Sequence, residues 1–263
     1  MGIMGLYRHR YLIYVLTKNE VVKRYKGSYI GIGWSFLTPL MMLGIYTLVF
    51  GEILQARWSS QAGGAVKFAL VIYCGQNIFT LVSEAVSRAP SLVVSNPHFV
   101  KKVIFPLEIL PITIVGSALL NSILSFLVLG LFVGFSHGGL SWTFILLPIV
   151  LGPIVLFVLG LCWFFSSLGT YIRDIETVIP LALTGLLFLS PVFYPLSAVP
   201  AKLQFLFYLN PLTYPIEEVR GILLWGITPS WGNLLLEWFA GLITMIAGYT
   251  WFQKTKEGFA DVL

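Results

Sequence analysis

The sequence predicts an all-α integral membrane protein with six transmembrane helices, and three observations support this fold class. First, 57% of the 263 residues are hydrophobic and only 10% are charged, against roughly 25% charged in an ordinary soluble domain. Second, the charged residues leave intervals long enough for the about 20 apolar residues that cross a bilayer core. Third, runs such as Thr143–Phe165 lack the alternation of polar and apolar residues that a membrane β-barrel requires.

The uncharged intervals place the six spans. The 64 residues between Glu108 and Arg173 carry no charge, which is too many for one helix and enough for two helices with a turn at Ser136–Ser141. The other spans occupy separate intervals, and the last of them contains Glu237. The expected helices are Ile32–Phe50, Phe68–Ala85, Ile109–Phe135, Trp142–Leu168, Thr177–Tyr194 and Trp231–Phe252.

The positive charges indicate the orientation. When the spans are drawn, twelve Lys and Arg residues fall on one side of the membrane and four on the other. The positive-inside rule then places both termini in the cytoplasm. Three regions follow: residues 1–31 form a cytoplasmic or interfacial segment, 32–252 the transmembrane domain and 253–263 a cytoplasmic tail.

The first segment is too charged for a cleaved signal peptide. Within it, Tyr7–Lys26 interleaves apolar and basic residues, as an amphipathic helix lying on lipid headgroups would. The alternative is that these charges only direct the topology.

Residues 190–230, on the outer side, do not form an ordinary span. Six prolines separate apolar pieces, Leu203–Leu209 and Ile216–Trp225, that are too short to cross a bilayer and too apolar for open water. We expect two short helices that dip into the outer leaflet as a gate, or else a cap that rests on the membrane. On the second piece, Glu217, Glu218 and Arg220 face partners or water, or form a salt bridge that positions the helix.

Two further segments carry polar chemistry. The loop 88–108 is cut by three prolines and contains a basic pair, which predicts a short cytoplasmic helix that a soluble partner can contact. On the first span, Trp34, Ser35, Thr38 and Tyr46 share one sector at 100° per residue. This sector is suited to line a channel for a sugar chain; the alternative is that Trp34 only anchors the span at the interface.

The sequence favours no catalytic or metal centre. Cys74 and Cys162 fall inside spans and are expected to be buried thiols, and the three histidines are scattered. The dipeptide Gly-Lys of a phosphate-binding loop is absent, so any ATP must be bound by another chain. A membrane-embedded enzyme that modifies lipid or glycan, and a passive channel that needs no ATPase, are the alternative classes.

Six blocks, in order along the chain, resemble the permease subunits of ABC exporters for bacterial polysaccharides, above all the O-antigen and teichoic-acid family of Wzm-like and TagG-like proteins. The blocks are Leu16–Gly51, Ser95–Pro111 ("SNPHFVKKVIFPLEILP"), Arg173-Asp174, Ser190–Pro195 ("SPVFYP"), Asn210–Gly221 ("NPLTYPIEEVRG") and the C-terminal "GYTWFQKTKEGFADVL".

The resemblance implies a homodimer in the bacterial inner membrane with two copies of a cytoplasmic ATPase, which bind ATP and Mg²⁺; this chain would hold no cofactor. The substrate would be O-antigen polysaccharide on a polyprenyl pyrophosphate carrier, and the alternatives are capsular polysaccharide and teichoic acid. Coupling to the ATPase would involve Ser91, Ser95, Asn96, Pro97, Phe99, Lys101 and Lys102, and the periplasmic gate would involve Asn210, Pro211, Glu217, Glu218 and Arg220. On this pattern we expect Lys23, Arg24 and Lys26 to bind the pyrophosphate headgroup.

Overall fold

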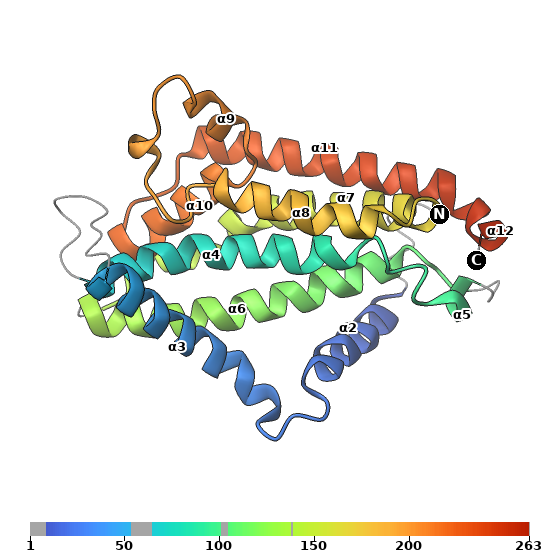
Figure 1. Ribbon diagram of the computed structural model, residues 1–263, viewed down its shortest axis with the longest axis horizontal. Helices are drawn as coiled ribbons and strands as arrows, with labels where there is room; N and C mark the ends of the chain where they lie inside the picture. The colour runs from blue at the N-terminus through green and yellow to red at the C-terminus, as the bar shows by residue number, and fades with distance from the viewer. Residues whose placement is uncertain (1–8, 54–64, 101–104, 138, 263) are drawn as a thin grey trace.

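The computed structural model describes residues 9–53, 65–100, 105–137 and 139–262, and in these ranges every regular element is a helix. Five helical segments are long and apolar enough to cross a membrane. They are Trp34–Ile53, Phe68–Arg88, Ile109–Phe135, Trp142–Tyr171 and Trp231–Gly258. The chain is therefore a multi-pass helical membrane protein. The four later segments lie side by side in an elongated bundle, and the first runs obliquely to them (Figure 1).

Five of the predicted spans match the observed helices to within a few residues. The first is α3 (Trp34–Tyr46), which continues into a π-helical turn over Thr47–Ile53. The others are α4 (Ala65–Arg88), α6 (Ile109–His137), α7 (Leu147–Tyr171), which follows a 3-10 turn over Trp142–Leu146, and α11 (Trp231–Thr255).

The predicted span Thr177–Tyr194 differs from the structure. It corresponds to α8 (Ile175–Phe188), a helix of 14 residues that is shorter than the other spans. The helix ends early because Ser190 precedes Pro191, and the residue before a proline is disfavoured in helical conformation. The Ser190 hydroxyl donates to the Leu186 carbonyl at 2.6 Å and closes the last turn. Tyr194 lies beyond this turn.

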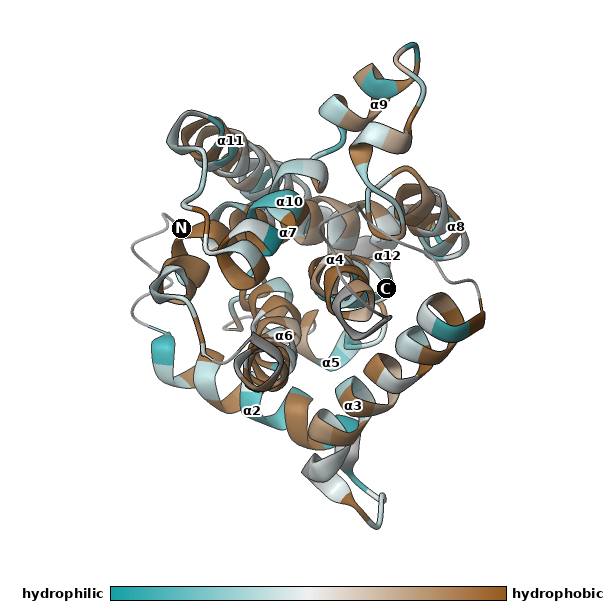
Figure 2. Cartoon of the chain, turned by 90° about the vertical axis from the view of Figure 1, so that its left-hand side faces the viewer, coloured by the Kyte–Doolittle hydropathy of each residue, from teal (hydrophilic) through white to brown (hydrophobic). Residues whose placement is uncertain are grey.

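Helix α4 forms the centre of the bundle. Its residues from Phe68 to Val86 are mostly buried, and α6, α7, α8 and the short helix α10 (Thr213–Arg220) pack against it (Figure 2). Helix α4 is less apolar than α6 or α7, yet it is the most buried of the five candidate spans. Polar side chains within a membrane are costly unless protein or water surrounds them, which favours a central position for this helix.

Helices α7 and α11 pack backbone to backbone at three glycines. A Cβ added at Gly160 would lie 2.3 Å from the Thr244 carbonyl oxygen, and one at Gly248 would lie 2.0 Å from the oxygen of Gly160. Gly241 approaches the Pro153 oxygen in the same way. Small residues permit this close approach of membrane helices, so α7 and α11 form one tightly joined pair.

The short helices occupy the two ends of the bundle. At one end, α9 (Gln204–Leu209) and α10 lie in the proline-rich segment, and α10 continues into a π-helical turn over Gly221–Trp225. That turn ends at Gly226, whose φ of +65° favours glycine. At the other end lie α5 (Pro97–Val100) and α12 (Phe259–Val262), the last described helix (Figure 1).

Helix α2 (Arg10–Tyr25) runs obliquely along α6 and meets α3 at a sharp bend (Figure 1). Gly116 on α6 provides the close contact, because a Cβ there would lie 3.1 Å from the Thr17 methyl group. The tyrosines Tyr11 and Tyr14 are exposed on the outward side of α2. The helix predicted in Tyr7–Lys26 is therefore present over its described residues.

Candidate translocation site

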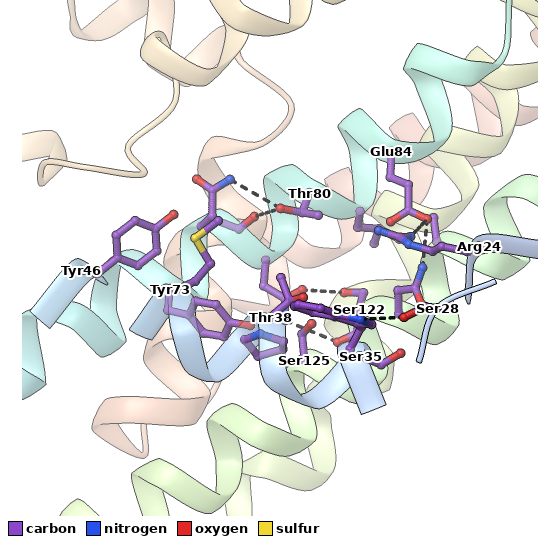
Figure 3. Close-up of a pocket in the computed structure, with 18 residues that line it drawn as sticks. Arg24, Ser28, Ser35, Thr38, Tyr46, Tyr73, Thr80, Glu84, Ser122 and Ser125 are labelled. Atoms are coloured by element: carbon purple, nitrogen blue, oxygen red, sulfur yellow. Dashed lines mark hydrogen bonds and ion pairs between the residues drawn. The ribbon is translucent and has the colours of Figure 1, made fainter. Parts of the chain in front are cut away.

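A cavity of about 450 Å³ lies between α3, α4 and α6 (Figure 3). All four residues predicted on the first span, Trp34, Ser35, Thr38 and Tyr46, line it. Helix α4 contributes Tyr73, Gln76, Asn77, Thr80, Leu81 and Glu84, and helix α6 contributes Ala118, Asn121, Ser122 and Ser125. The wall therefore combines aromatic rings with hydroxyl and amide groups. That side chains of α3 and α4 line the same cavity can be seen only in the three-dimensional structure.

One face of helix α3 lines this cavity, and the other faces point away from it. Trp34 Nε1 donates to the Ser28 hydroxyl at 2.8 Å, which fixes the start of the helix against the preceding loop. Large apolar side chains on its other faces, such as Met41 and Ile45, are exposed and do not line the cavity. The sector inferred from the sequence thus points to one cavity, while its role as a channel wall stays a prediction.

The wall between α4 and α6 is held by a pair of polar contacts. The Ser122 hydroxyl donates to Asn77 Oδ1 at 3.1 Å, and Asn77 Nδ2 donates to the Ser122 carbonyl oxygen at 3.4 Å. Both side chains are buried. Since buried polar groups require partners, this pair sets the register of α4 against α6 beside the cavity.

A polar stripe on α4 was not predicted from the sequence. Gln76, Thr80, Ser83 and Ser87 follow one another at intervals of three or four residues, and Glu84 is four residues after Thr80, so all five share one helix face. Ser83, Glu84 and Ser87 also line a second hollow of about 290 Å³ between α4 and α8, and Glu84 lines both cavities. This spacing could have revealed the stripe from the sequence. In the prediction of the spans, however, Glu84 only marked the end of an uncharged interval.

Of the three cations predicted to bind a pyrophosphate, only Arg24 lines the cavity. Its guanidinium Nη1 lies 2.5 Å from Glu84 Oε1, and Asn121 Nδ2 donates to the same oxygen at 2.9 Å. Lys23 instead pairs with Glu20 on its own helix at 3.1 Å. Lys26 is exposed after the end of α2. The headgroup role of the three residues remains a prediction.

Glu20 is held in its ionised form by two cations. Partial burial alone would raise its pKa, but hydrogen bonds and charges from Arg88 and Lys23 outweigh burial and leave the pKa below the ordinary value. The Arg88 guanidinium donates to Glu20 Oε2. The ion pair joins the middle of α2 to the end of α4.

The predicted coupling loop packs firmly on the end of α7. A Cβ at Gly169 would lie 2.3 Å from the Pro90 carbonyl oxygen, so helix and loop touch through their backbones. Val93 belongs to a small buried cluster with Trp163, Tyr249, Phe252 and Phe259. The beginning of the loop is thus joined to α7, α11 and the C-terminal helix.

The remaining coupling residues lie on or near α5. Ser91 donates to the Arg88 carbonyl at 3.5 Å, and Asn96 donates to that of Leu92 at 2.8 Å. Ser95 and Pro97 are exposed, and Phe99 stacks on Phe105. Lys101 and Lys102 lie outside the described residues. The expected short helix is present as the four residues of α5.

At the opposite end, the predicted gate residues form a polar anchor. Arg220 is completely buried and donates from Nε to the Val71 carbonyl at 3.0 Å and from Nη2 to that of Val192 at 2.9 Å. Its Nη1 pairs with Glu217 at 2.8 Å. The sequence left open whether these charged residues face partners or water or form a salt bridge. The salt bridge is present in the structure.

Asn210 and Pro211 form the turn between α9 and α10. Asn210 Nδ2 donates to the Leu189 carbonyl and to the Ser190 hydroxyl, both at 2.9 Å, while its Oδ1 accepts from the Leu212 amide at 2.9 Å. Asn210 is buried and Pro211 exposed. Asn210 thus ties the hairpin to the end of α8.

Glu218 and Glu237 have buried carboxylate oxygens with no hydrogen-bond partner among the described residues. Glu237 and Asn210 line a cavity of about 260 Å³ between α7, α11 and the segment of α9 and α10. The ranges that the structure describes contain no group of three or more His, Cys, Asp or Glu residues that could hold a metal ion.

The described helices form a multi-pass bundle with a polar cavity beside α3, an arrangement that suits a membrane transport protein. The chain belongs to the ABC-2 type transporter family, whose model matches residues 11–224. Members are non-catalytic membrane subunits of ABC systems, and such a system implies an ATPase subunit as partner.

Three similar proteins carry the name of an O-antigen export system permease. The chain is 29% identical to the O-antigen export system permease protein RfbA of Myxococcus xanthus over 75% of this chain and 73% of the relative. It is 25% identical to the protein of the same name from Klebsiella pneumoniae, over 96% of this chain and 95% of the relative. A second Klebsiella pneumoniae RfbA is 24% identical over the same shares.

Proposed function

We propose that this chain is the permease subunit of an ATP-driven ABC exporter that moves O-antigen, linked to polyprenyl pyrophosphate, across the bacterial inner membrane. The similarity to O-antigen permeases covers nearly the full length of both chains. The observation in the structure that supports it most is the cavity that combines Trp34, Tyr46 and Tyr73 with hydroxyl and amide side chains. Aromatic faces suit pyranose rings, while the polar groups suit the sugar hydroxyls.

A channel for a long glycan needs a second copy of this chain. The polar stripe of α4 faces between α3 and α8, and the hollow there is open on one side. A homodimer that joins two such faces would enclose both stripes and shield them from lipid, where exposed polar groups are costly. We therefore assign the channel to the space between α3, α4 and α8 of two copies.

The number of crossings supports the inner-membrane topology. The first and last described residues lie at the same end of the bundle (Figure 1), which requires an even number of crossings. Five long segments and α8 make six. At about 1.5 Å per residue the 14 residues of α8 reach about 21 Å, so the turns that flank α8 complete its crossing. The distribution of basic residues supports a cytoplasmic position for both termini.

The proposed partner contact is the end of the bundle that carries α5. The residues assigned to coupling lie on a loop that packs on Gly169, and this packing would transmit an ATPase movement to the α7–α11 pair. On the outer side, the α9–α10 hairpin, held by Arg220, would form the gate. Residues 1–31 would lie at the cytoplasmic interface, with Tyr11 and Tyr14 directed to the headgroups.

A reconstituted exporter tests this function. The chain is co-expressed with a candidate ABC ATPase subunit from the same genome, and the purified complex is placed in proteoliposomes. Glycan on undecaprenyl pyrophosphate should raise ATP hydrolysis and appear in the opposite compartment. Stimulation only by glycan on a phosphatidylglycerol-type lipid would instead indicate a capsule exporter, and no ATPase in the complex would contradict the proposal.

A further inference from the structure

Four charged residues join α2 to α4 through two reciprocal ion pairs. Glu20 and Arg24 are one turn apart on α2, and Glu84 and Arg88 are one turn apart on α4. Arg24 pairs with Glu84 and Arg88 pairs with Glu20. The order of charges is the same on both helices, and the pairing is antiparallel. We call these four residues the charge clasp.

The two pairs of the clasp have different surroundings. Among the described residues that line the larger cavity, Arg24 and Glu84 are the only charged ones, and neither Glu20 nor Arg88 lines it. The Glu84 side chain is 12% exposed, whereas the Arg24 side chain is 46% exposed. Arg24 and Glu84, which we call the inner pair, therefore combine a nearly buried anion with a cation that is exposed to the cavity.

An arginine in this position can exchange one anion for another. A guanidinium group matches the oxygens of a phosphate as well as those of a carboxylate, and its bonds to phosphate are charge-assisted. A partly exposed ion pair contributes little to stability, so a second anion that reaches the cavity can compete for Arg24. Asn121 Nδ2 donates to Glu84 Oε1 at 2.9 Å, and because this bond does not involve Arg24 it can persist during such an exchange.

From this geometry we infer that Glu84 competes with the substrate for Arg24. The diphosphate of the lipid-linked substrate displaces Glu84 from Arg24, and this binding releases α2 from α4. The inference rests on the proposed function and assigns the regulation of its headgroup site to Glu84. Release would reach α3 through the loop that follows α2, where Ser28 accepts the hydrogen bond of Trp34. The outer pair, Glu20 and Arg88, limits how far α2 can move.

Binding of undecaprenyl pyrophosphate to the permease–ATPase complex in nanodiscs tests the exchange, with neutral undecaprenol as the control lipid. Glu84→Gln removes the competitor and should tighten binding at least fivefold, whereas Arg24→Gln should weaken it at least tenfold. The double variant should bind like Arg24→Gln. The matched control is Glu20→Gln, which removes the same charge from the outer pair and should change the Kd less than twofold.

Amide hydrogen exchange provides a second readout that needs no binding constant. In the wild-type complex, undecaprenyl pyrophosphate should increase exchange in α2, and undecaprenol should not. In Glu84→Gln, exchange in α2 should already be high without lipid. Binding that is equal in wild type, Arg24→Gln and Glu84→Gln would overturn the inference and leave the proposed function intact. A wild-type complex that exports glycan on another lipid and does not bind the pyrophosphate carrier would overturn both.

Discussion

Gly75 on α4 lies directly beneath the guanidinium group of Arg220 on α10. A Cβ at Gly75 would lie 2.9 Å from Arg220 Nη2, 3.2 Å from the Ile216 methyl carbon and 3.3 Å from the backbone Cα of Val192. The missing side chain thus provides the space in which a buried cation reaches backbone carbonyls of α4 and of the segment after α8. This contact holds the proposed gate hairpin on the central helix.

Gly75→Ala should separate the hairpin from α4. The added methyl group would displace Arg220 and press on the Val192 backbone, and overpacking of this kind costs about 1–3 kcal/mol. We expect a lower unfolding temperature for the purified protein and reduced glycan export. The control is Gly44→Ala, where nothing lies within 4 Å of the new Cβ. Equal unfolding temperatures for the two variants would argue against the contact.

Gly169→Ala should weaken the coupling between the ATPase and the channel. Its Cβ would lie 2.3 Å from the Pro90 carbonyl oxygen, which is backbone and cannot move away without shifting the loop. We expect the permease to retain its ATPase subunits but to lose most substrate-stimulated transport per ATP hydrolysed. Gly185→Ala on α8, with open space around its Cβ, is the control. Unchanged transport per ATP in Gly169→Ala would contradict the role of this contact.

Glu218→Gln and Glu237→Gln should not destabilise the protein. Both carboxylates have buried oxygens for which no described side chain is a donor, and a buried negative charge without a paired cation is more costly than a neutral amide of the same shape. We expect unfolding temperatures equal to or above that of the wild type at pH 7.5. A clear decrease would show that the carboxylates hold a ligand or a proton that the amide cannot replace.

The docking of α2 should depend on pH through Glu20. Because ion pairs lower the pKa of Glu20 in the folded protein, its ionised form contributes stability above the ordinary value of 4.5. This contribution is lost as the pH falls through the lowered value. Hydrogen exchange in α2 should therefore increase at acidic pH relative to exchange in α7. Glu20→Gln should weaken this dependence, and a profile unchanged by the substitution would assign the effect to another group.

Much of the fold could be predicted because hydropathy is a property of local sequence. Five spans match the structure closely, since windows of about 20 apolar residues have few alternatives to a membrane helix. The predicted end of the fifth span at Tyr194 was wrong. Helix α8 ends earlier, within an otherwise apolar stretch, because of the local turn at Ser190 and Pro191. Helical spacing alone also selected the face of α3 that lines the larger cavity.

The sequence by itself determined the class of protein, the approximate spans and the polar face of α3. Only the tertiary structure decided which polar groups meet: Arg24 and Glu84 are 60 residues apart, and Arg220 reaches Val71 across 149. Such pairs depend on how each helix is rotated and how closely it approaches its neighbours. Contacts at Gly75, Gly116 and Gly160 set these quantities, and a hydropathy pattern within one span carries no information about them.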